Sequence, residues 1–584
     1  MAITGTIYSS RFRSFCSRYK TGSRDNNNRA GLFSTIVLGL ALALPSVVSA
    51  QDESQQNSAQ QEEQQTEEQK FDLWEFRVVG NTLLEKRDIE STLYPYLGRG
   101  KDANTVEMAK KALQERYAQA GYHTVIVDTP PQDGEGGILR FKVIEGRVGR
   151  IRVVDSDYFL LSRIKNEVPA LEEGKVPHMP TVQKQLAQLN GKTPDRRVSP
   201  YMKPGRKAGT VDFDLKVKDQ FPLHGDIELN DQYSSGTEKL RLSGSLRYTN
   251  LWQKEHSASV QFMTTPEDVD QINILSATYM FKPDLSDNYH VFYAVNSKSD
   301  LATLGDSNTT FTVKGDGHIL GYRRITPYMP VDGLSHSLTL GIDYKSFVDS
   351  TGVTIGVGGT SVEEVEETPI DYVMFSAGYS ATQRRNSSST TFNAGARFGV
   401  RELENDKEEF EGKSYSRRPN FLAFKGGITH KHDLFWGLQS SSAFNFQIAN
   451  TPLISNERHS VGGANTVRGY LESQISGDDA VLYKLTLHKP LQKYIDWQAL
   501  DEWRFGLFAE GGFTRKRGEL EEDDITAEKR EITVREEIHS AGINMQIALW
   551  ERLFLTLDWG KPLTDNGDVE RGDARTHFRL RYQF

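Results

Sequence analysis

The pattern of apolar and polar residues changes once along this 584-residue chain, close to Pro222. Before that point, short apolar runs are separated by stretches with helical spacing, and one such stretch places several apolar residues on a single helix face. These residues are Val106, Ala109, Leu113 and Tyr117. After Pro222, apolar residues alternate with polar ones as far as the last residue. A period of two puts successive side chains on opposite faces of a strand, so this second region is predicted to be all β.

Residues 71–221 contain two units with the same predicted order of elements, strand, helix, helix, strand and strand. In the first unit, residues 71–146, strands are expected near 75–81, 124–129 and 138–145, and helices near 84–94 and 106–117. In the second unit, residues 147–221, strands are expected near 149–155, 197–202 and 211–218, and helices near 158–168 and 182–189. Each unit has about 75 residues, which is small but sufficient for an independent fold.

Residues 222–584 are predicted to form about sixteen strands, an even number that closes an antiparallel barrel. The apolar face of these strands is bulky and rich in aromatic residues, as expected of a surface that faces lipid. Short connections are expected near 383–388, 430–435 and 549–553, and long ones at 297–317, 347–372, 400–417 and 514–536. Short periplasmic turns with long outer loops are typical of bacterial outer-membrane barrels, which favours this interpretation over a soluble β-sandwich.

Composition adds information about export. The long apolar run at 32–48 follows six basic residues and ends in Val48-Ser49-Ala50, so residues 1–50 are expected to be a secretory signal peptide. Residues 51–70 are almost wholly Gln, Glu and Ser, the composition of a flexible linker. Without residues 1–50, 64 basic and 78 acidic residues leave a net charge of −14, which disfavours nucleic-acid binding. The single cysteine, Cys16, lies in the expected signal peptide, which leaves no disulfide and no cysteine metal site.

Short motifs in the same order resemble the TpsB family of two-partner-secretion transporters, of ShlB/FhaC type. In the first unit, the runs that resemble a POTRA domain are VVGNTLL at 78–84, GYHTV at 121–125 and EGRVG at 145–149. In the second unit they are VPALEEG at 168–174, Pro204-Gly205 and GTV at 209–211. In the last region, the runs that resemble the family's barrel are Asn250-Leu251-Trp252, Val467-Arg468-Gly469-Tyr470 and the terminal Phe584. The resemblance extends over nearly all of residues 71–584.

This resemblance implies an α+β periplasmic part of two POTRA domains, followed by an all-β, 16-stranded antiparallel transmembrane barrel. It also implies that residues 450–478, between the eleventh and twelfth strands, fold back into the barrel lumen and carry the run 467–470 as a latch. On the thirteenth strand the family has the pattern Phe-x-Asp-x-Gly. This chain has Phe508, Glu510 and Gly512 there, with glutamate in place of aspartate.

Strand alternation independently predicts that Arg468 meets Glu510. If Phe505, Leu507 and Phe513 face lipid, then Glu510 points into the lumen. A guanidinium stays charged and presents a rigid fork of donors, so an arginine held by packing needs an acidic partner. A carboxylate facing lipid would be costly, whereas one in a polar lumen can receive a loop arginine. The alternative is that the two side chains are separately solvated in the lumen.

The resemblance implies that the POTRA domains bind an unfolded client, and β-augmentation at an exposed strand edge is the expected mode. A candidate surface lies between the second helix and the following strand of the first unit, with Leu113, Tyr117, Val125 and Val127. The alternative is that these four side chains belong to the core.

At the C-terminus, another set resembles the signal that the barrel-assembly machinery reads. This set is Phe578, Leu580, Tyr582 and Phe584.

We therefore expect an outer-membrane transporter that moves a large secreted exoprotein to the cell surface, as in haemolysin or adhesin secretion. The alternative is an outer-membrane protein assembly insertase of the same superfamily.

No catalytic set, nucleotide motif or metal-ligand spacing is found, so neither enzyme activity nor a cofactor or metal is expected. The expected partners are an exoprotein with an N-terminal secretion domain, the barrel-assembly machinery, and outer-membrane lipid with lipopolysaccharide. The protein is expected to be a monomer with its N-terminal domains in the periplasm. Lys484, His488, Arg579 and Arg581 are expected to make the lumen polar.

Overall fold

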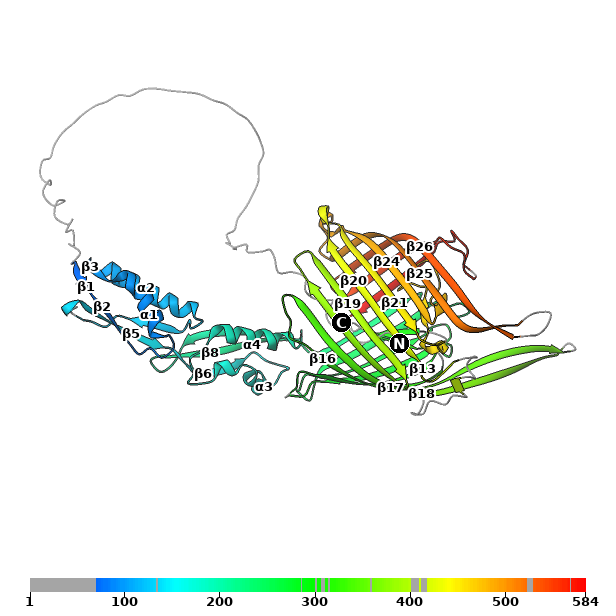
Figure 1. The fold of residues 1–584 in the computed structure, drawn as a ribbon, viewed down its shortest axis with the longest axis horizontal. Helices are drawn as coiled ribbons and strands as arrows, with labels where there is room; N and C mark the ends of the chain where they lie inside the picture. The colour runs from blue at the N-terminus through cyan, green and yellow to red at the C-terminus, as the bar shows by residue number, and fades with distance from the viewer. Residues whose placement is uncertain are drawn as a thin grey trace, which may run out of the picture.

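The computed structural model describes residues 70–584 apart from 133–134, 285, 300–301, 306–309, 314–315, 358–359, 401–408, 411–416, 523–528 and 568. The expected signal peptide, 1–50, and all but the last residue of the expected linker, 51–70, lie outside the described residues. Two small α/β modules lie in a row beside a large barrel (Figure 1). The predicted fold class is confirmed, because the barrel is closed by sixteen antiparallel strands.

The first module is a three-stranded sheet, ordered β2-β5-β4, packed with two helices. Its elements are β1 (Phe71–Leu73), β2 (Glu75–Val79), α1 (Lys86–Leu93), η1 (Tyr94–Tyr96), β3 (Gly98–Lys101), α2 (Ala103–Gln119), β4 (Val125–Asp128), η2 (Glu135–Gly137) and β5 (Ile138–Glu145). Helix α2 begins where the Asp102 carboxylate accepts the amide of Thr105 at 2.7 Å, an N-cap contact. The predicted apolar stripe of α2 lies in the core against Phe141. The pair β1 and β3, a small second sheet, was not predicted.

The second module repeats this plan with a sheet ordered β6-β8-β7. Its elements are β6 (Arg147–Val154), α3 (Leu161–Asn166), η3 (Pro169–Leu171), α4 (Met179–Gly191), β7 (Arg196–Pro204) and β8 (Thr210–Asp219). The modules meet where the amide of Met179 donates to the carbonyl of Gly121 at 2.9 Å and the ring of His178 lies against Tyr122. Each module therefore has its own apolar core, and a short contact joins the two.

The barrel pairs each strand with its neighbours in chain order and closes between its first and last strands. Its strands are β9 (Leu223–Asn230), β10 (Arg241–Leu251), β11 (His256–Thr264), β12 (Asn273–Phe281), β13 (Tyr289–Lys298), β16 (Asp316–Pro327), β17 (Leu334–Val357), β18 (Thr360–Arg384), β19 (Ser388–Gly399), β20 (Leu422–Asp433), β21 (Gln439–Ala449), β24 (Asp479–Pro490), β25 (Leu500–Glu522), β26 (Lys529–Leu549), β27 (Leu553–Pro562) and β28 (Arg575–Gln583). The shorter elements outside the wall are β14 (Ala302–Gly305), β15 (Thr310–Val313), η4 (Phe435–Gly437) and η6 (Gln492–Tyr494).

The two faces of the wall follow from strand alternation. On β25, Leu507 is 54% exposed on the outer face, whereas Glu510 is 1% exposed on the lumen side. Outward apolar residues meet lipid and inward polar ones meet the lumen, which is the arrangement of transmembrane barrels. Within the part of the chain that the structure describes, no helix is long and apolar enough to cross a membrane.

Two connections predicted to be long loops are instead mostly paired strands. The ladder between β17 and β18 continues to Val357 opposite Thr360, and that between β25 and β26 continues to Glu522 opposite Lys529. Both hairpins extend beyond the rest of the barrel on the side away from the modules (Figure 1). Residues 347–372 and 514–536 are rich in Val, Ile, Thr and charged residues, so the ladder can continue into solvent with β-branched residues along it.

Candidate functional site

The segment between β21 and β24, residues 450–478, lies inside the barrel. In strand order it falls between the eleventh and twelfth strands of the barrel. It contains the turn η5 (Ser455–Glu457) and a small hairpin of β22 (His459–Val461) and β23 (Ile475–Gly477). Its tip packs in one apolar cluster, in which Val461, Val467, Tyr470 and Ile475 of the loop contact Leu482, Ile538 and Val569 outside it. We call residues 450–478 the lumen loop.

Arg468 at the tip of the lumen loop is bound to Glu510 of β25. Its Nη2 lies 2.6 Å from Glu510 Oε1, and its Nε lies 3.1 Å from Glu510 Oε2. The backbone amide of Arg468 donates to the same Oε2 at 3.0 Å. Arg468 is 6% exposed and Glu510 is 1% exposed, so water competes little for this charge-assisted, bidentate contact. Glutamate in place of the family's aspartate therefore reaches both the side chain and the backbone of the arginine.

Arg468 has a second carboxylate partner, Asp558 of β27, which sequence reasoning missed. Arg468 Nη1 lies 2.6 Å from Asp558 Oδ1, and Asn544 Nδ2 donates to the same oxygen at 2.6 Å. The guanidinium carbon lies 3.6 Å from the centre of the Phe508 ring, a cation–π contact. The signal was present in the sequence, because the alternation of β27 directs Asp558 into the lumen.

Gly469 allows the tip to approach the wall closely. Its φ of +95° lies in the region that favours glycine, and a Cβ there would lie 3.0 Å from the carbonyl carbon of Gly560 on β27. A Cβ on Gly560 would in turn lie 2.7 Å from the nitrogen of Gly469. The amide of Gly469 donates to Nε2 of His577 at 3.0 Å. Two glycines facing each other thus let the backbone of the loop contact the backbone of the wall.

The residues that flank Arg468 and Gly469 are buried as well. The Tyr470 hydroxyl lies 2.7 Å from the carbonyl oxygen of Thr564 and 3.0 Å from that of His539, so it contacts both the segment after β27 and the middle of β26. Val467 packs in the apolar cluster of the lumen loop. All four residues of the run 467–470 therefore contact the wall, by ion pair, close backbone approach, hydrogen bond and apolar packing.

Two of the predicted lumen cations also contact the loop tip. Lys484 Nζ donates to the carbonyl of Asn465 at 2.7 Å, and Arg579 Nη2 lies 3.0 Å from the side-chain oxygen of Asn465. Lys484 also lies 3.5 Å from Glu510, so the Glu510 carboxylate is shared between Lys484 and Arg468. His488 instead contacts Asn544 at 2.9 Å, and Arg581 stacks on the ring of Phe554. The lumen cations are therefore divided between loop and wall.

The C-terminal set lies where the barrel closes. Phe578, Leu580 and Tyr582 belong to β28, and Phe584 follows its end with the amide bonded to the carbonyl of Gly225 at 3.0 Å. Leu580, Tyr582 and Phe584 are exposed on the outer face. Their role as an assembly signal stays a prediction.

The four side chains proposed for client binding need a correction. Leu113, Tyr117, Val125 and Val127 are buried in the core of the first module and present no surface to a partner. Burial, with a smaller effect from Glu145, raises the pKa of Tyr117 to about 12, and its hydroxyl donates to Asn81 at 2.6 Å. The prediction failed because helical and strand periodicity mark an apolar face without distinguishing core from groove. Strand β4 still lies at an edge of its sheet.

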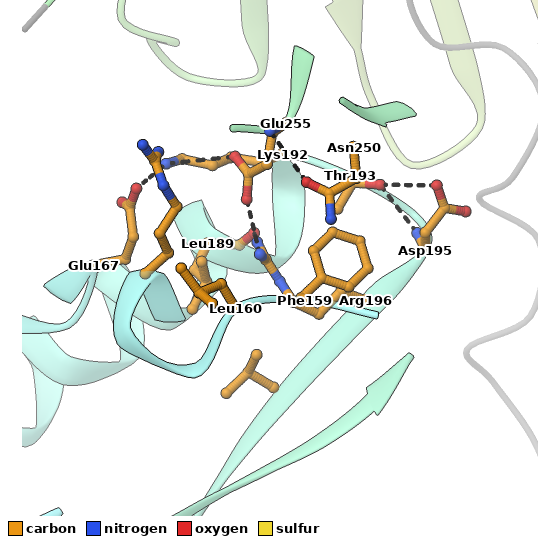
Figure 2. Close-up of polar contacts among 12 residues, drawn as sticks. Phe159, Leu160, Glu167, Leu189, Lys192, Thr193, Asp195, Arg196, Asn250 and Glu255 are labelled. Carbon is orange, nitrogen blue, oxygen red and sulfur yellow. Dashed lines mark hydrogen bonds and ion pairs between the residues drawn. The ribbon is translucent and has the colours of Figure 1, made fainter. Parts of the chain in front are cut away.

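The second module is joined to the barrel through the first barrel turn. Buried Arg196 binds Glu255 at 2.7 Å, donates to the carbonyl of Leu189 at 3.0 Å and stacks on Phe159 (Figure 2). Figure 2 also shows Lys192 beside Glu255, at 3.8 Å. We call this cluster of Arg196, Glu255, Lys192, Phe159 and Leu189 the module–barrel joint.

Asp195, next to Arg196 in the chain, adds a second set of contacts at this joint. His224, Thr249 and Gln220 lie 2.8, 2.6 and 2.9 Å from its carboxylate oxygens. Burial alone would raise the pKa of Asp195, but hydrogen bonds from His224, Thr249 and Gln220 outweigh it and lower the pKa to about 2. The carboxylate is therefore ionised at neutral pH and ties the second module to β9 and β10.

Among the described residues, no group of three or more His, Cys, Asp or Glu side chains is placed to hold a metal ion. The lumen site consists of ion pairs, hydrogen bonds and apolar packing between a loop and a wall. Such contacts can hold a segment in place and release it without a covalent step.

Two α/β modules, a closed barrel and a loop held in its lumen define an outer-membrane protein of the POTRA and barrel architecture. A family model described as "POTRA domain, ShlB-type" matches residues 71–146, and one described as "Haemolysin secretion/activation protein ShlB/FhaC/HecB" matches residues 363–524. The chain thus contains two segments similar to the ShlB/FhaC type, and its architecture is that of outer-membrane proteins with periplasmic POTRA domains.

Individual relatives agree with this family. The chain is 22% identical over 445 residues to the outer membrane transporter CdiB of Dickeya dadantii, covering 74% of this chain and 73% of that one. It is 19% identical over 420 residues to the heme/hemopexin transporter protein HuxB of Haemophilus influenzae, covering 71% of each. The solved structure of CdiB from Escherichia coli has the same fold, with a TM-score of 0.54, 17% identity and coverage of 89% and 92%. BamA from Haemophilus ducreyi lacking POTRA domains 1–3 shares the fold at a TM-score of 0.52, 14% identity and coverage of 88% and 100%.

Proposed function

We propose that this transporter binds an unfolded exoprotein through its two POTRA domains and passes it through the barrel to the cell surface. The observation that carries the proposal is the lumen loop, which occupies the barrel and is held at its tip by Arg468 on Glu510 and Asp558. The contacts that hold the loop are non-covalent, so displacement of the loop can open a path without unfolding the barrel.

The POTRA domains supply strand edges for an extended client. The sheet of the first domain ends in β2 and β4, and the sheet of the second ends in β6 and β7. The second half of β7 is exposed along its length, including Tyr201 and Met202. An edge strand offers unpaired main-chain groups, which bind an extended segment with little demand on its sequence. An unfolded client suits such a surface better than a folded one.

The free energy for export would come from binding and folding of the client. The chain carries no nucleotide-binding motif. Folding of the client outside the cell removes the unfolded form and draws further chain through the pore by mass action. The lumen loop would then control when the path is open.

Co-expression with a large exoprotein encoded beside this transporter tests the proposal. The intact transporter is expected to release that exoprotein to the medium, and Arg468→Ala to reduce the release strongly while the barrel still inserts. Arg581→Ala is a matched control, because this arginine stacks on Phe554 of the neighbouring strand. Heat-modifiable migration on a gel checks barrel folding in each variant.

Two results would contradict the proposal in different ways. If the intact transporter releases none of the exoprotein, the export function itself is wrong. If Arg468→Ala secretes normally, export can stand but the loop has no part in its control.

A further inference from the structure

A buried glutamate lies at the root of the lumen loop, away from the tip that Arg468 holds. Glu457 ends the turn η5 and is 0% exposed. Its carboxylate pairs with Lys345 of β17 and with Arg397 of β19, the latter at 2.8 Å. The Tyr372 hydroxyl of β18 donates to the same carboxylate at 2.8 Å. Three neighbouring wall strands thus direct two cations and a hydroxyl at one loop carboxylate.

The backbone at the root is held by the same part of the wall. Gln447 of β21 donates to the carbonyl of Glu457 at 3.2 Å and to that of Asp478 at 3.0 Å. Arg397 Nη2 lies 3.0 Å from the side-chain oxygen of Gln447, so the amide is oriented by the same arginine. Residues 457 and 478 lie near the two ends of the lumen loop, so the side chain of Gln447 contacts the backbone at both ends.

The root and the tip bind different parts of the wall with opposite charges. At the tip, a cation of the loop enters an acidic part of the wall, formed by Glu510 of β25 and Asp558 of β27. At the root, an anion of the loop enters a basic part, formed by Lys345 and Arg397. Because a buried charge left without its partner is strongly unfavourable, each contact resists removal of the loop independently.

We propose that Glu457 is a second latch of the lumen loop, opposite in charge to Arg468, and that the pore opens fully only when both are released. Glu457 is a positioning residue: it holds the root so that the tip can reach Glu510. Its expected effect on export rests on the proposed function, whereas its effect on the loop does not.

Conductance of the purified transporter in planar bilayers tests this second latch without a client. Glu457→Gln keeps the shape of the side chain and removes its charge. It is expected to raise the fraction of time the pore is open by on the order of tenfold, the change that a loss of about 1.4 kcal/mol produces. Tyr372→Phe removes one hydrogen bond to Glu457 and is expected to act in the same direction, more weakly.

Asp343→Asn is the matched control. Asp343 is as buried as Glu457 and lies on β17, two residues before Lys345, but its carboxylate binds Arg323 at 2.6 Å and the Tyr293 hydroxyl, both on barrel strands. This variant removes a buried charge without touching the loop. It is expected to leave pore opening unchanged even if it lowers the stability of the barrel.

A disulfide reports the position of the loop directly. An ideal Cβ on Gly512 of β25 would lie 3.5 Å from Cβ of Val461 in β22, within the range of a disulfide. The only native cysteine is Cys16, in the expected signal peptide, so Val461→Cys with Gly512→Cys forms the test pair. Adding Glu457→Gln is expected to slow disulfide formation in proportion to the closed-state population that is lost, because β22 then spends less time against β25.

Unchanged conductance and unchanged cross-linking in Glu457→Gln would overturn the second latch, as would equal changes in Asp343→Asn. If Glu457→Gln does not insert, Tyr372→Phe decides the question, and no increase in its open fraction would overturn the proposal. Neither measurement involves an exoprotein. A transporter that fails to export would thus contradict the proposed function and leave this result intact.

Discussion

Two buried arginines of this transporter have nearly the same local surroundings. Arg468 in the lumen loop lies over the ring of Phe508 at 3.6 Å, and Arg196 in the second module lies over that of Phe159 at 4.9 Å. Arg468 binds a glutamate at 2.6 Å, and Arg196 binds Glu255 at 2.7 Å. Their exposed fractions are 6% and 3%.

The difference lies in what else holds each segment. Arg468 has two carboxylates and lies at a loop tip that the wall holds through wall side chains, including Lys484 on the carbonyl of Asn465. Arg196 has one carboxylate and a backbone carbonyl, and belongs to a strand within a sheet. The lumen contact is therefore mainly ionic and can be exchanged for other charges. The module–barrel joint adds backbone constraints, so its arginine stabilises an arrangement that other contacts also support.

Reversing the charge of Arg468 is expected to have the largest effect. Arg468→Glu places a third carboxylate beside Glu510 and Asp558, and should remove about 3–5 kcal/mol of closed-state stabilisation. Bilayer conductance should show a mostly open pore, and export of the exoprotein should fall. Combining it with Glu510→Arg should restore part of the closed state, because Asp558 still repels the new glutamate. If the double variant is closed no more often than Arg468→Glu alone, the pairing of Arg468 with Glu510 is contradicted.

Blocking the close backbone approach should give a smaller effect of the same kind. Gly560→Ala introduces a Cβ 2.8 Å from the carbonyl carbon of Arg468, which should displace the loop tip at a cost of about 1–3 kcal/mol. Gly378→Ala on β18 is the control, because its nearest heavy atom lies 4.0 Å away. Conductance should rise for the first variant alone. Equal behaviour would mean that the loop tip does not depend on this contact.

Removing the charge of Arg196 should loosen the joint without opening the pore. Arg196→Met keeps the packing on Phe159 and is expected to lose about 2 kcal/mol of contact energy with Glu255 and Leu189. Pulsed electron paramagnetic resonance between labels on the second module and a short barrel turn should give a broader distance distribution. Arg163→Met is the control, since its exposed pair with Asp284 is expected to contribute little. An open pore in Arg196→Met would contradict this prediction, because the module–barrel joint would then also control pore opening.

Acid should weaken the module–barrel joint through Asp195, and this is the smallest effect expected because Asp195 stays ionised at neutral pH. The pKa of Asp195 is lowered from its ordinary value of 3.8 to about 2, so its stabilisation is complete above pH 3.8 and is lost as the pH falls toward 2. The label distances should broaden over that range. Asp195→Asn should remove most of this pH dependence. A joint that loosens between pH 7 and 5 would point to a different titrating group.

Much of the fold could be predicted because alternation and helical spacing are local properties of the chain. The sixteen strands, the place of Val467–Tyr470 between the eleventh and twelfth, and the inward direction of Glu510 all follow from counting and parity. The long outer hairpins were missed because alternation does not say where a ladder leaves the membrane. The buried state of Leu113 and Val125 was left open because an apolar face looks the same in a core and in a groove.

The partners of the lumen loop depend on contacts between residues far apart in the sequence. Asp558 lies 90 residues from Arg468, and Lys345 lies 112 residues from Glu457. Neither pairing can be inferred from the position of the residues in the sequence, since several inward carboxylates or cations could neutralise each charge. Closure of the barrel decides which of them meet.

The sequence by itself therefore determined the two-part architecture, the two faces of each strand and the charge of each lumen residue, because these depend on side-chain type and on neighbours along the chain. Only the tertiary structure decided that the wall binds an anion at the root of the loop and a cation at its tip. This pairing requires the curvature that brings β17, β19, β25 and β27 around one lumen. Burial then turns these pairings into strong contacts, since water no longer competes for the same donors and acceptors.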